Sequence, residues 1–275
     1  MKRIFLIASA SLLMLASCQK KDYIVVIKTA YGDIRVILYD QTPKHKQNFL
    51  YLARTGQYDS TVFHRVIRNF MIQGGDVNAK PGMEDKIDYT IPAEFIDTLI
   101  HHRGALAAAR LGDQQNPERA SSGCQFYIVQ GLVQSETELT TDMARLNQYL
   151  NRIGELPGYE SMPDTLNAIY YSKGNEAYYQ KILSLKPVLE EGFSINLSRN
   201  YPERRMKVYT TLGGTPHLDD AYTVFGRVVE GLEVVEKIAG VQTGQANRPV
   251  ENIYIRMELE PISPKQLQKR YPSPF

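Results

Sequence analysis

The feature that most constrains the fold is a series of short segments rich in β-branched and aromatic residues. The first two lie within residues 23–39, YIVVIKTAYGDIRVILY, around a turn at Tyr31, Gly32 and Asp33. Apolar runs of this length that are bounded by turn residues are typical of strands. Further segments of the same kind occupy residues 61–67, 70–73, 104–109, 125–130, 222–229 and 252–259. Many short strands with hairpin turns predict a mainly β fold, a closed antiparallel barrel.

Two short helices are predicted beside these strands. Thr42 and Pro43 form a favourable helix start, because threonine caps an N-terminus and proline suits the first turn. Gly56 is placed to end this helix. The second helix lies between the last two strands, and its apolar residues recur at helical spacing. They are Leu232, Val235, Ile238 and Ala239.

The strand pattern is interrupted between residues 133 and 212. Leu139, Met143, Leu146, Leu150 and Ile153 are spaced by four, three, four and three positions, which predicts a helix. A second helix is predicted around residues 178–185 and is ended or kinked by Pro187, and a third covers residues 202–211. We therefore predict a helical insertion, residues 133–212, between two parts of the barrel, residues 23–132 and 213–260. Its eight tyrosines are interpreted as packing residues, with partner binding as the alternative.

The N-terminus has the layout of a secretory signal. A basic start, Met1 to Arg3, precedes the uncharged run IFLIASASLLMLAS, which is too short to span a membrane as a mature helix. The run ends in LASC, which resembles the lipobox of bacterial lipoproteins. That resemblance implies removal of residues 1–17 and lipidation of Cys18, with residues 18–22 as a short linker. We expect a lipid anchor in the bacterial cell envelope, with the outer membrane preferred because Gln19 is not an aspartate. A plain secretory signal and an N-terminal anchor helix are the alternatives.

Charge and cysteine usage restrict the partners. The formal charge of +2 falls to 0 when Lys2 and Arg3 are removed, so the chain has no concentrated basic segment that would indicate a nucleic-acid partner. If Cys18 carries lipid, Cys124 is left without a disulfide partner, and we expect it to be a buried apolar residue. His101 and His102 are neighbours that point apart in an extended chain, so we predict no metal site there. The proline-rich end, residues 261–275, is predicted to be a tail.

Three further segments lead to a family resemblance. They are FHRVIRNFMIQGGD at residues 63–76, GALAAAR followed by SSGCQFYIV within residues 104–129, and LDDAYTVFGR at residues 218–227. In order and spacing they resemble the signature of cyclophilin-type peptidyl-prolyl isomerases. The resemblance covers about residues 23–132 and 213–260. It implies an eight-stranded antiparallel barrel capped by two helices, and a monomer without a cofactor that acts on proline-containing peptides and on unfolded or folding proteins.

The resemblance also implies roles for individual residues. Arg65 corresponds to the catalytic arginine of the family, and Gln73 to the glutamine that orients it. The residues implied to bind the substrate are Phe70, Met71, Tyr127 and Leu218 around the proline ring, and Ala109, Arg110 and Gln125 along the peptide backbone. Tyr222 is also implied to bind the substrate, although it stands where well-known members have histidine. His217 stands where they have a tryptophan that contributes to cyclosporin binding. We therefore expect weak inhibition by cyclosporin.

The chemistry of such a site agrees with the absence of a nucleophile from the FHRVIRNFMIQGGD segment. Rotation about an X–Pro bond breaks no bond, but it has a barrier of about 18–20 kcal/mol because twisting removes amide resonance. A fixed guanidinium that binds the twisted amide more tightly than either planar form lowers this barrier. Two other classes of function remain open. They are a non-catalytic peptide-binding chaperone and an envelope scaffold lipoprotein that uses the groove and the insertion.

Overall fold

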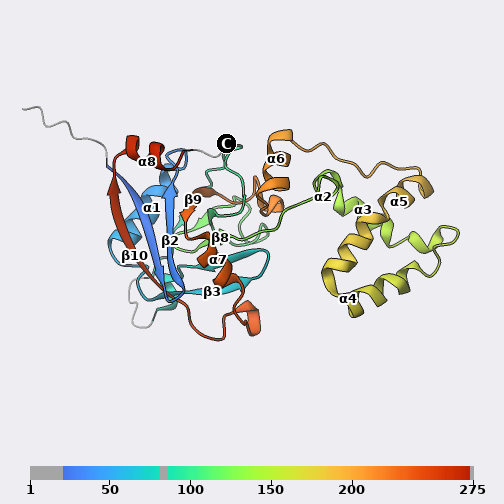
Figure 1. Cartoon of the computed structure of the whole chain (residues 1–275), viewed down its shortest axis with the longest axis horizontal. Coiled ribbons are helices and arrows are strands. Elements are labelled where there is room, and N and C mark those ends of the chain that lie inside the picture. The colour runs from blue at the N-terminus through green and yellow to red at the C-terminus, as the bar shows by residue number, and fades with distance from the viewer. Residues whose placement is uncertain (1–20, 81–85, 273–275) are drawn as a thin grey trace, which may run out of the picture.

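A computed structural model describes residues 21–80 and 86–272 of the chain. These residues form a β-barrel from which a group of helices projects to one side (Figure 1). The expected signal peptide, Cys18 and the last three residues lie outside the described residues. Within the described part of the chain, no helix has the length and apolar character that crossing a membrane would require.

Eight strands form the closed antiparallel barrel that the sequence predicts. Around the barrel they run in the order β1, β10, β3, β4, β8, β6, β9 and β2, and β1 also pairs with β2. The strands are β1 Asp22–Thr29, β2 Gly32–Leu38, β3 Thr61–Ile67, β4 Met71–Gly74, β6 Ala105–Ala108, β8 Phe126–Val129, β9 Val224–Glu230 and β10 Tyr254–Ile262. A separate two-stranded sheet joins β5 Thr90–Ile91 to β7 Ser121–Ser122.

The two predicted capping helices are α1 Pro43–Arg54 and α7 Leu232–Ala239. Their apolar faces pack into the same core as the inward-facing barrel residues. Phe49 of α1, for example, lies 5.3 Å from the rings of both Phe126 and Phe225, measured between ring centroids. Burial of one such side chain stabilises the fold by about 1.5–3 kcal/mol, so these helices close the barrel by filling it.

Five α-helices lie between β8 and β9. They are α2 Glu136–Thr140, α3 Met143–Leu150, α4 Met162–Ser184, α5 Lys186–Gly192 and α6 Glu203–Thr211. The apolar stripe at residues 139–153 does not form one helix, because Thr141 is extended and Asp142 caps α3 by accepting from the backbone N–H of Arg145. Pro187 lies in the first turn of α5, just after the end of α4. Gly174 interrupts α4 with a φ of 82°.

These helices divide into two groups with separate cores. Leu139 of α2 and Val208 and Tyr209 of α6 pack with Ile100, which lies between β5 and β6. Helices α3 to α5 enclose their own cluster, which includes Leu146 and Leu189. The chain enters and leaves this second group at one place, where Asp142 N–H donates to the carbonyl of Leu197 at 2.8 Å. We call residues 142–197 the distal lobe, and α2 and α6 the proximal helices.

The C-terminal segment differs from the predicted tail. Strand β10 continues to Ile262, and α8 follows at Pro264–Arg270. Ser263 and Gln266 form a capping box at the start of α8, and a proline in the first turn favours the helix. Arg227 of β9 donates to the carbonyl oxygens of Tyr271 and Pro272. Capping and this attachment to the barrel give the segment a regular structure that its composition does not indicate.

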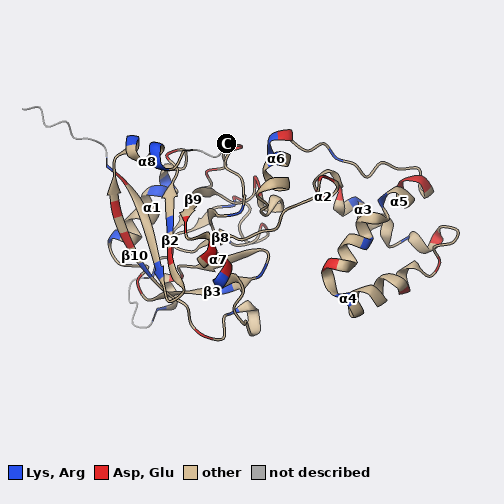
Figure 2. Cartoon of the chain, in the orientation of Figure 1, with Lys and Arg blue, Asp and Glu red and all other residues tan. Residues whose placement is uncertain are grey.

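Charged residues of both signs are distributed over the whole molecule. Figure 2 shows basic and acidic residues mixed along the barrel and along the projecting helices. Many of them form ion pairs, such as Lys46 with Asp22 at 2.9 Å. The surface of residues 21–80 and 86–272 therefore carries no single large field of one sign.

Candidate active site

The register of neighbouring strands brings the expected site residues together. Arg65 on β3 lies opposite Gln73 on β4, and Gln73 lies opposite Tyr127 on β8. Cross-strand partners project from the same face of a sheet, so these three side chains lie side by side. A pocket of about 90 Å³ opens beside them. Its lining consists of Arg65, Phe70, Met71, Gln73, Ala109, Arg110, Tyr127, Leu218 and Tyr222.

Arg65 is held by a chain of amide contacts. Its Nη1 donates to Oε1 of Gln73 at 3.2 Å, and Nε2 of Gln73 donates to Oε1 of Gln125 at 3.0 Å. Gln125 thus supports the pocket from behind, although it is absent from its lining. In the part of the chain that the structure describes, no carboxylate forms an ion pair with Arg65. The guanidinium is therefore oriented without being neutralised, which leaves its other N–H groups able to donate to a bound molecule.

The pocket floor is apolar and rigidly packed. Met71, Ala109 and Tyr127 are buried in a cluster of small and aromatic side chains, against which Phe70 and Leu218 pack as partly exposed walls. The ring of Phe70 stacks on His217 at 5.5 Å between centroids. A small apolar hollow of this kind suits one compact ring and excludes water from it.

Arg110 is part of the wall and does not reach into the pocket as a free cation. Its Nε donates to the carbonyl of Ala221 at 2.7 Å, and its Nη1 forms an ion pair with Asp113 at 2.6 Å. The guanidinium lies 4.3 Å from the centroid of the Tyr222 ring. This cation–π contact fixes Tyr222 at the edge of the pocket.

The polar contacts of the Tyr127 hydroxyl were not predicted from the sequence. The Tyr127 hydroxyl lies 2.9 Å from Nε2 of His101, and Nδ1 of His101 lies 2.9 Å from Oδ1 of Asp219. Burial raises the pKa of the Tyr127 hydroxyl well above its usual range, so this hydroxyl keeps its proton. From the sequence, His101 was considered only together with His102, as a possible pair of metal ligands. In the structure, the buried His101 side chain lies within hydrogen-bond distance of both Tyr127 and Asp219.

The remaining residues of the signature segment lie outside the pocket lining. His64 adjoins Arg65, and burial lowers the pKa of its imidazole. Arg68 is exposed at the turn between β3 and β4, and Asn69 beside it has a φ of 66°. Cys124 is buried, which confirms its expected packing role, and burial raises the pKa of its thiol. Among residues 21–80 and 86–272, no group of three or more potential metal ligands is assembled.

A wider hollow of about 570 Å³ adjoins the pocket on the other side of Arg65. His64, Arg65 and Arg248 contribute to its lining. Two more hollows, of about 300 and 370 Å³, lie elsewhere on the barrel and contain none of the expected site residues. Size alone therefore does not identify the site. The small pocket and the wide hollow share Arg65, which gives an extended chain room on both sides of the guanidinium.

The sequence as a whole is similar to proteins of one family. The family described as "Cyclophilin type peptidyl-prolyl cis-trans isomerase/CLD" matches residues 24–145 and 194–258. A peptidyl-prolyl cis-trans isomerase of Staphylococcus saprophyticus is 31% identical over 234 residues, which are 84% of this chain and 88% of that protein. A Streptococcus pyogenes protein, named for both phosphatase and peptidyl-prolyl isomerase functions, is 34% identical over 236 residues. The chain spans only 37% of that longer protein.

The fold is also similar to solved structures. A cyclophilin type isomerase of Cryptosporidium parvum superposes with a TM-score of 0.51 at 20% identity, covering 86% of this chain and 98% of that one. A second structure of that protein was determined in the presence of the dipeptide Ala-Pro and superposes equally well. Because the family match covers well over half of the sequence, the chain belongs to the cyclophilin-type peptidyl-prolyl cis-trans isomerase family.

Proposed function

We propose that the protein accelerates rotation of X–Pro bonds in unfolded or folding polypeptides, with Arg65 donating a hydrogen bond to the prolyl nitrogen of the twisted amide. In a planar amide this nitrogen shares its lone pair with the carbonyl group and is a poor acceptor. Twisting returns the lone pair to the nitrogen. A donor aimed at that position therefore binds the twisted form more tightly than either planar form, which is the requirement for catalysis.

The observation that carries this proposal is the guanidinium of Arg65 at the edge of a small pocket. It is oriented by Gln73 and has no ion-pair partner among the described residues. With the proline ring held between Phe70, Met71 and Leu218, one side of the bond is anchored while the other side rotates. Hydrogen bonds to charged groups contribute about 1.5–3 kcal/mol each. One such bond, made only in the twisted state, corresponds to a rate factor of about 10 to 100.

The direct test is an isomerase assay on a short proline peptide with the wild type, Arg65→Ala and Arg68→Ala. Arg68 is a matched control, because it lies on the same hairpin but is exposed and lines no part of the pocket. We expect the wild type and Arg68→Ala to accelerate cis–trans exchange equally. Arg65→Ala should lose about 10- to 100-fold in kcat/KM, with an unchanged circular dichroism spectrum. Undetectable exchange with the folded wild type would refute the proposal.

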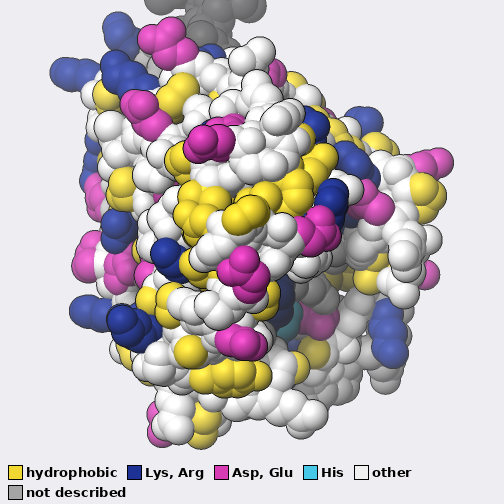
Figure 3. All heavy atoms as spheres, turned by 90° about the vertical axis from the view of Figure 1, so that its right-hand side faces the viewer, with side chains coloured by type: hydrophobic (Ala, Val, Ile, Leu, Met, Phe, Trp, Pro, Cys, Tyr) yellow, Lys and Arg dark blue, Asp and Glu magenta, His cyan; other side chains and the backbone are white. Residues whose placement is uncertain are grey.

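A second function is favoured by the surface of the distal lobe. Tyr170 and Tyr171 are 44% and 85% exposed, on the turn of α4 just before Gly174. Figure 3 shows hydrophobic side chains gathered across the face that the projecting helices present. We propose that the distal lobe binds apolar segments of an unfolded substrate protein while the prolines of that protein reach the pocket of the barrel. The arrangement of Arg65 and Gln73 argues against a purely non-catalytic chaperone or a scaffold, since neither needs an oriented guanidinium.

We further propose that a lipid on Cys18 anchors a single copy of the protein to the cell envelope, on the outer membrane. The support is the LASC sequence after a short apolar run with a basic start. The test is incorporation of labelled fatty acid in bacterial cells, with Cys18→Ala beside the wild type. We expect labelled wild type in the membrane fraction, and unlabelled Cys18→Ala outside it. A wild type that carries no label would contradict the anchor.

A further inference from the structure

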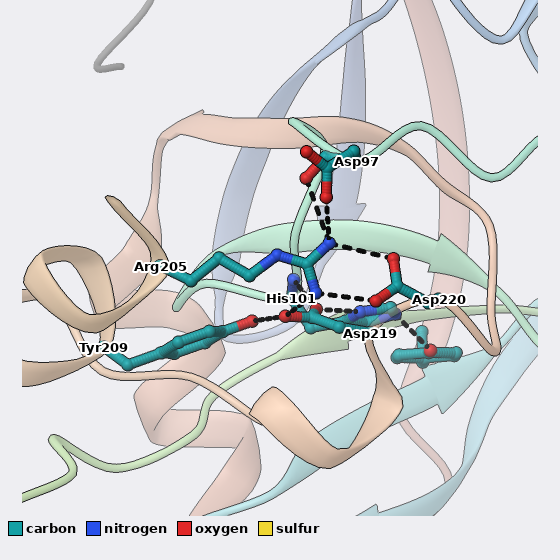
Figure 4. A network of polar contacts seen from close by, with 7 residues as sticks. Asp97, His101, Arg205, Tyr209, Asp219 and Asp220 are labelled. Atoms are coloured by element: carbon teal, nitrogen blue, oxygen red, sulfur yellow. Dashed lines mark hydrogen bonds and ion pairs between the residues drawn. The ribbon is translucent and has the colours of Figure 1, made fainter. Parts of the chain in front are cut away.

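Helix α6 of the insertion contacts residues that lie beside the pocket. Figure 4 shows Arg205 and Tyr209 extending from α6 toward Asp219 and Asp220. Arg205 donates to both carboxylate oxygens of Asp220 at 2.7 and 2.9 Å, and to Oδ1 of Asp97 at 2.6 Å. The Tyr209 hydroxyl donates to Oδ2 of Asp219 at 2.7 Å. Two side chains of the insertion thus hold two consecutive residues of the barrel.

Asp219 and Asp220 belong to the segment that forms one side of the pocket. This wall segment, residues 216–222, includes Leu218 and Tyr222, which both line the pocket. Asp220 has a φ of 61°, a conformation that a residue other than glycine adopts at a cost. The two hydrogen bonds from Arg205 to the carboxylate of Asp220 help to hold this turn, together with the bond that Nη1 of Arg119 donates to the carbonyl of Asp220 at 3.3 Å.

The same contacts reach the pocket floor through His101. Oδ1 of Asp219 lies 2.9 Å from both the backbone N–H and Nδ1 of His101, so Nδ1 must carry a proton. When the ring is neutral, Nε2 is then the acceptor, and the Tyr127 hydroxyl donates to it. With a neutral His101 ring, each contact in the series Tyr209, Asp219, His101 and Tyr127 has one donor and one acceptor. The series ends at the hydroxyl of Tyr127, whose ring lines the pocket.

Burial makes the series sensitive to the loss of one member. The side chain of Asp219 is only 4% exposed, and the residues on both sides of it in the series, His101 and Tyr209, are completely buried. A buried carboxylate that loses a donor is costly unless it moves toward water or a new partner. Movement of Asp219 would shift Leu218 next to it and would release His101.

We propose that Arg205 and Tyr209 are positioning residues of the prolyl pocket, so that helix α6 of the insertion holds both the wall segment and Tyr127 in place for the substrate. Neither residue lines the pocket. They act through Asp219 and Asp220. The proposal rests on the isomerase function proposed above, and it assigns to α6 a part of substrate binding that the barrel does not supply by itself.

The test compares Tyr209→Phe with Tyr201→Phe. Each change removes one hydroxyl from a partly or fully buried tyrosine of the same core. The Tyr201 hydroxyl, however, is buried without a hydrogen-bond partner among the described residues. We expect Tyr209→Phe to raise KM for a proline peptide about three- to tenfold with a smaller change in kcat, because a displaced wall weakens binding in both ground and transition states. Tyr201→Phe should match the wild type.

A second readout does not depend on catalysis. In methyl NMR spectra of the free protein, Tyr209→Phe and Arg205→Gln should shift the Leu218 methyl signals, whereas Tyr201→Phe should leave them in place. Combining Tyr209→Phe with Tyr127→Phe should raise KM by less than the product of the two single effects, since both act on one series of contacts.

The outcomes separate this proposal from the isomerase function itself. Unchanged KM and unchanged Leu218 signals in Tyr209→Phe would overturn the positioning role, even if Arg65→Ala abolishes activity. An inactive wild type would overturn the isomerase function, while the Leu218 signals would still report whether α6 holds the wall segment. Equal effects of Tyr209→Phe and Tyr201→Phe would show a general loss of packing and would also overturn the proposal.

Discussion

His102 lies on the segment that leads into β6, and burial lowers the pKa of its imidazole to about 4. Its Nδ1 lies 2.7 Å from the carbonyl of Arg103, so this nitrogen carries the proton of the neutral ring. In an unfolded chain a histidine titrates near 6.5. Between these two pKa values the unfolded state binds more protons than the folded state. The contribution of neutral His102 to the free energy of unfolding is therefore fully present above about pH 6.5 and is lost as the pH falls toward 4.

This shift predicts a measurable dependence of stability on pH. The contribution of His102 to the loss between pH 6.5 and 4 amounts to about 3 kcal/mol at most. Urea unfolding of the wild type and His102→Asn at pH 7 and at pH 4.5 measures it. As the pH is lowered, we expect the free energy of unfolding to fall more steeply in the wild type than in His102→Asn. The difference in slope corresponds to the uptake of up to about one more proton per molecule on unfolding. Equal pH slopes for the two proteins would contradict the assignment.

Site residues on adjacent strands could be anticipated because the signature segments follow the family's order and spacing. The contacts behind the pocket could not. His101 is 26 positions from Tyr127 and 118 positions from Asp219, and Tyr209 comes from a segment with no counterpart in the signature. Tyr127 was expected as an aromatic ring beside the proline. That expectation does not predict which buried group accepts the hydrogen bond of its hydroxyl.

At the scale of helices, the distal lobe behaves as a separable unit. Thr141 and Ser198 form an antiparallel bridge where the chain enters and leaves it, and Arg199 N–H donates to the carbonyl of Thr140 at 2.8 Å. The lobe has its own apolar core, whereas α2 and α6 pack with Ile100 of the barrel part. The family match also omits residues 146–193, all of which lie within the lobe.

Two deletions test whether the distal lobe and the proximal helices have separate roles. Replacing residues 142–197 with a short Asn-Gly turn should leave kcat/KM for a proline peptide within about threefold of the wild type, because Arg205 and Tyr209 remain. Replacing residues 135–211 removes both side chains and should raise KM. If the lobe holds clients, both deletions should also lose binding of an unfolded protein. A folded 142–197 deletion that fails to isomerise the peptide would contradict the division of roles.

Helices and strands whose apolar residues recur at a regular spacing were predicted well, and those without such a pattern were missed. The eight barrel strands and the two capping helices agree with the structure apart from shifts at their ends. Strands β5 and β7 have two residues each, too few for any alternation to be recognised. The stripe at residues 139–153 has a helical period but is broken by the extended Thr141. Helix α8 is specified by its capping box, in a segment whose prolines indicated a tail.

At the scale of the whole molecule, closure of the barrel joins the two ends of the described chain. Strand β1 pairs with β10 along its length, with Asp22 opposite Ile262 and Lys28 opposite Arg256. The pattern of short strands predicted a closed barrel, but local sequence patterns do not show which strands pair between segments this far apart. Closure places β3, β4, β8 and β6 side by side, and the pocket lies on that part of the barrel.

The central claim is that Arg65 binds the twisted amide in preference to the planar one. One NMR experiment tests it directly, by measuring both the dissociation constant and the cis–trans exchange rate of a proline peptide with the wild type and with Arg65→Ala. We expect Arg65→Ala to bind the peptide within about threefold of the wild type but to slow catalysed exchange by about 10- to 100-fold. Equal losses in binding and in exchange would contradict it, because Arg65 would then act only by holding the substrate.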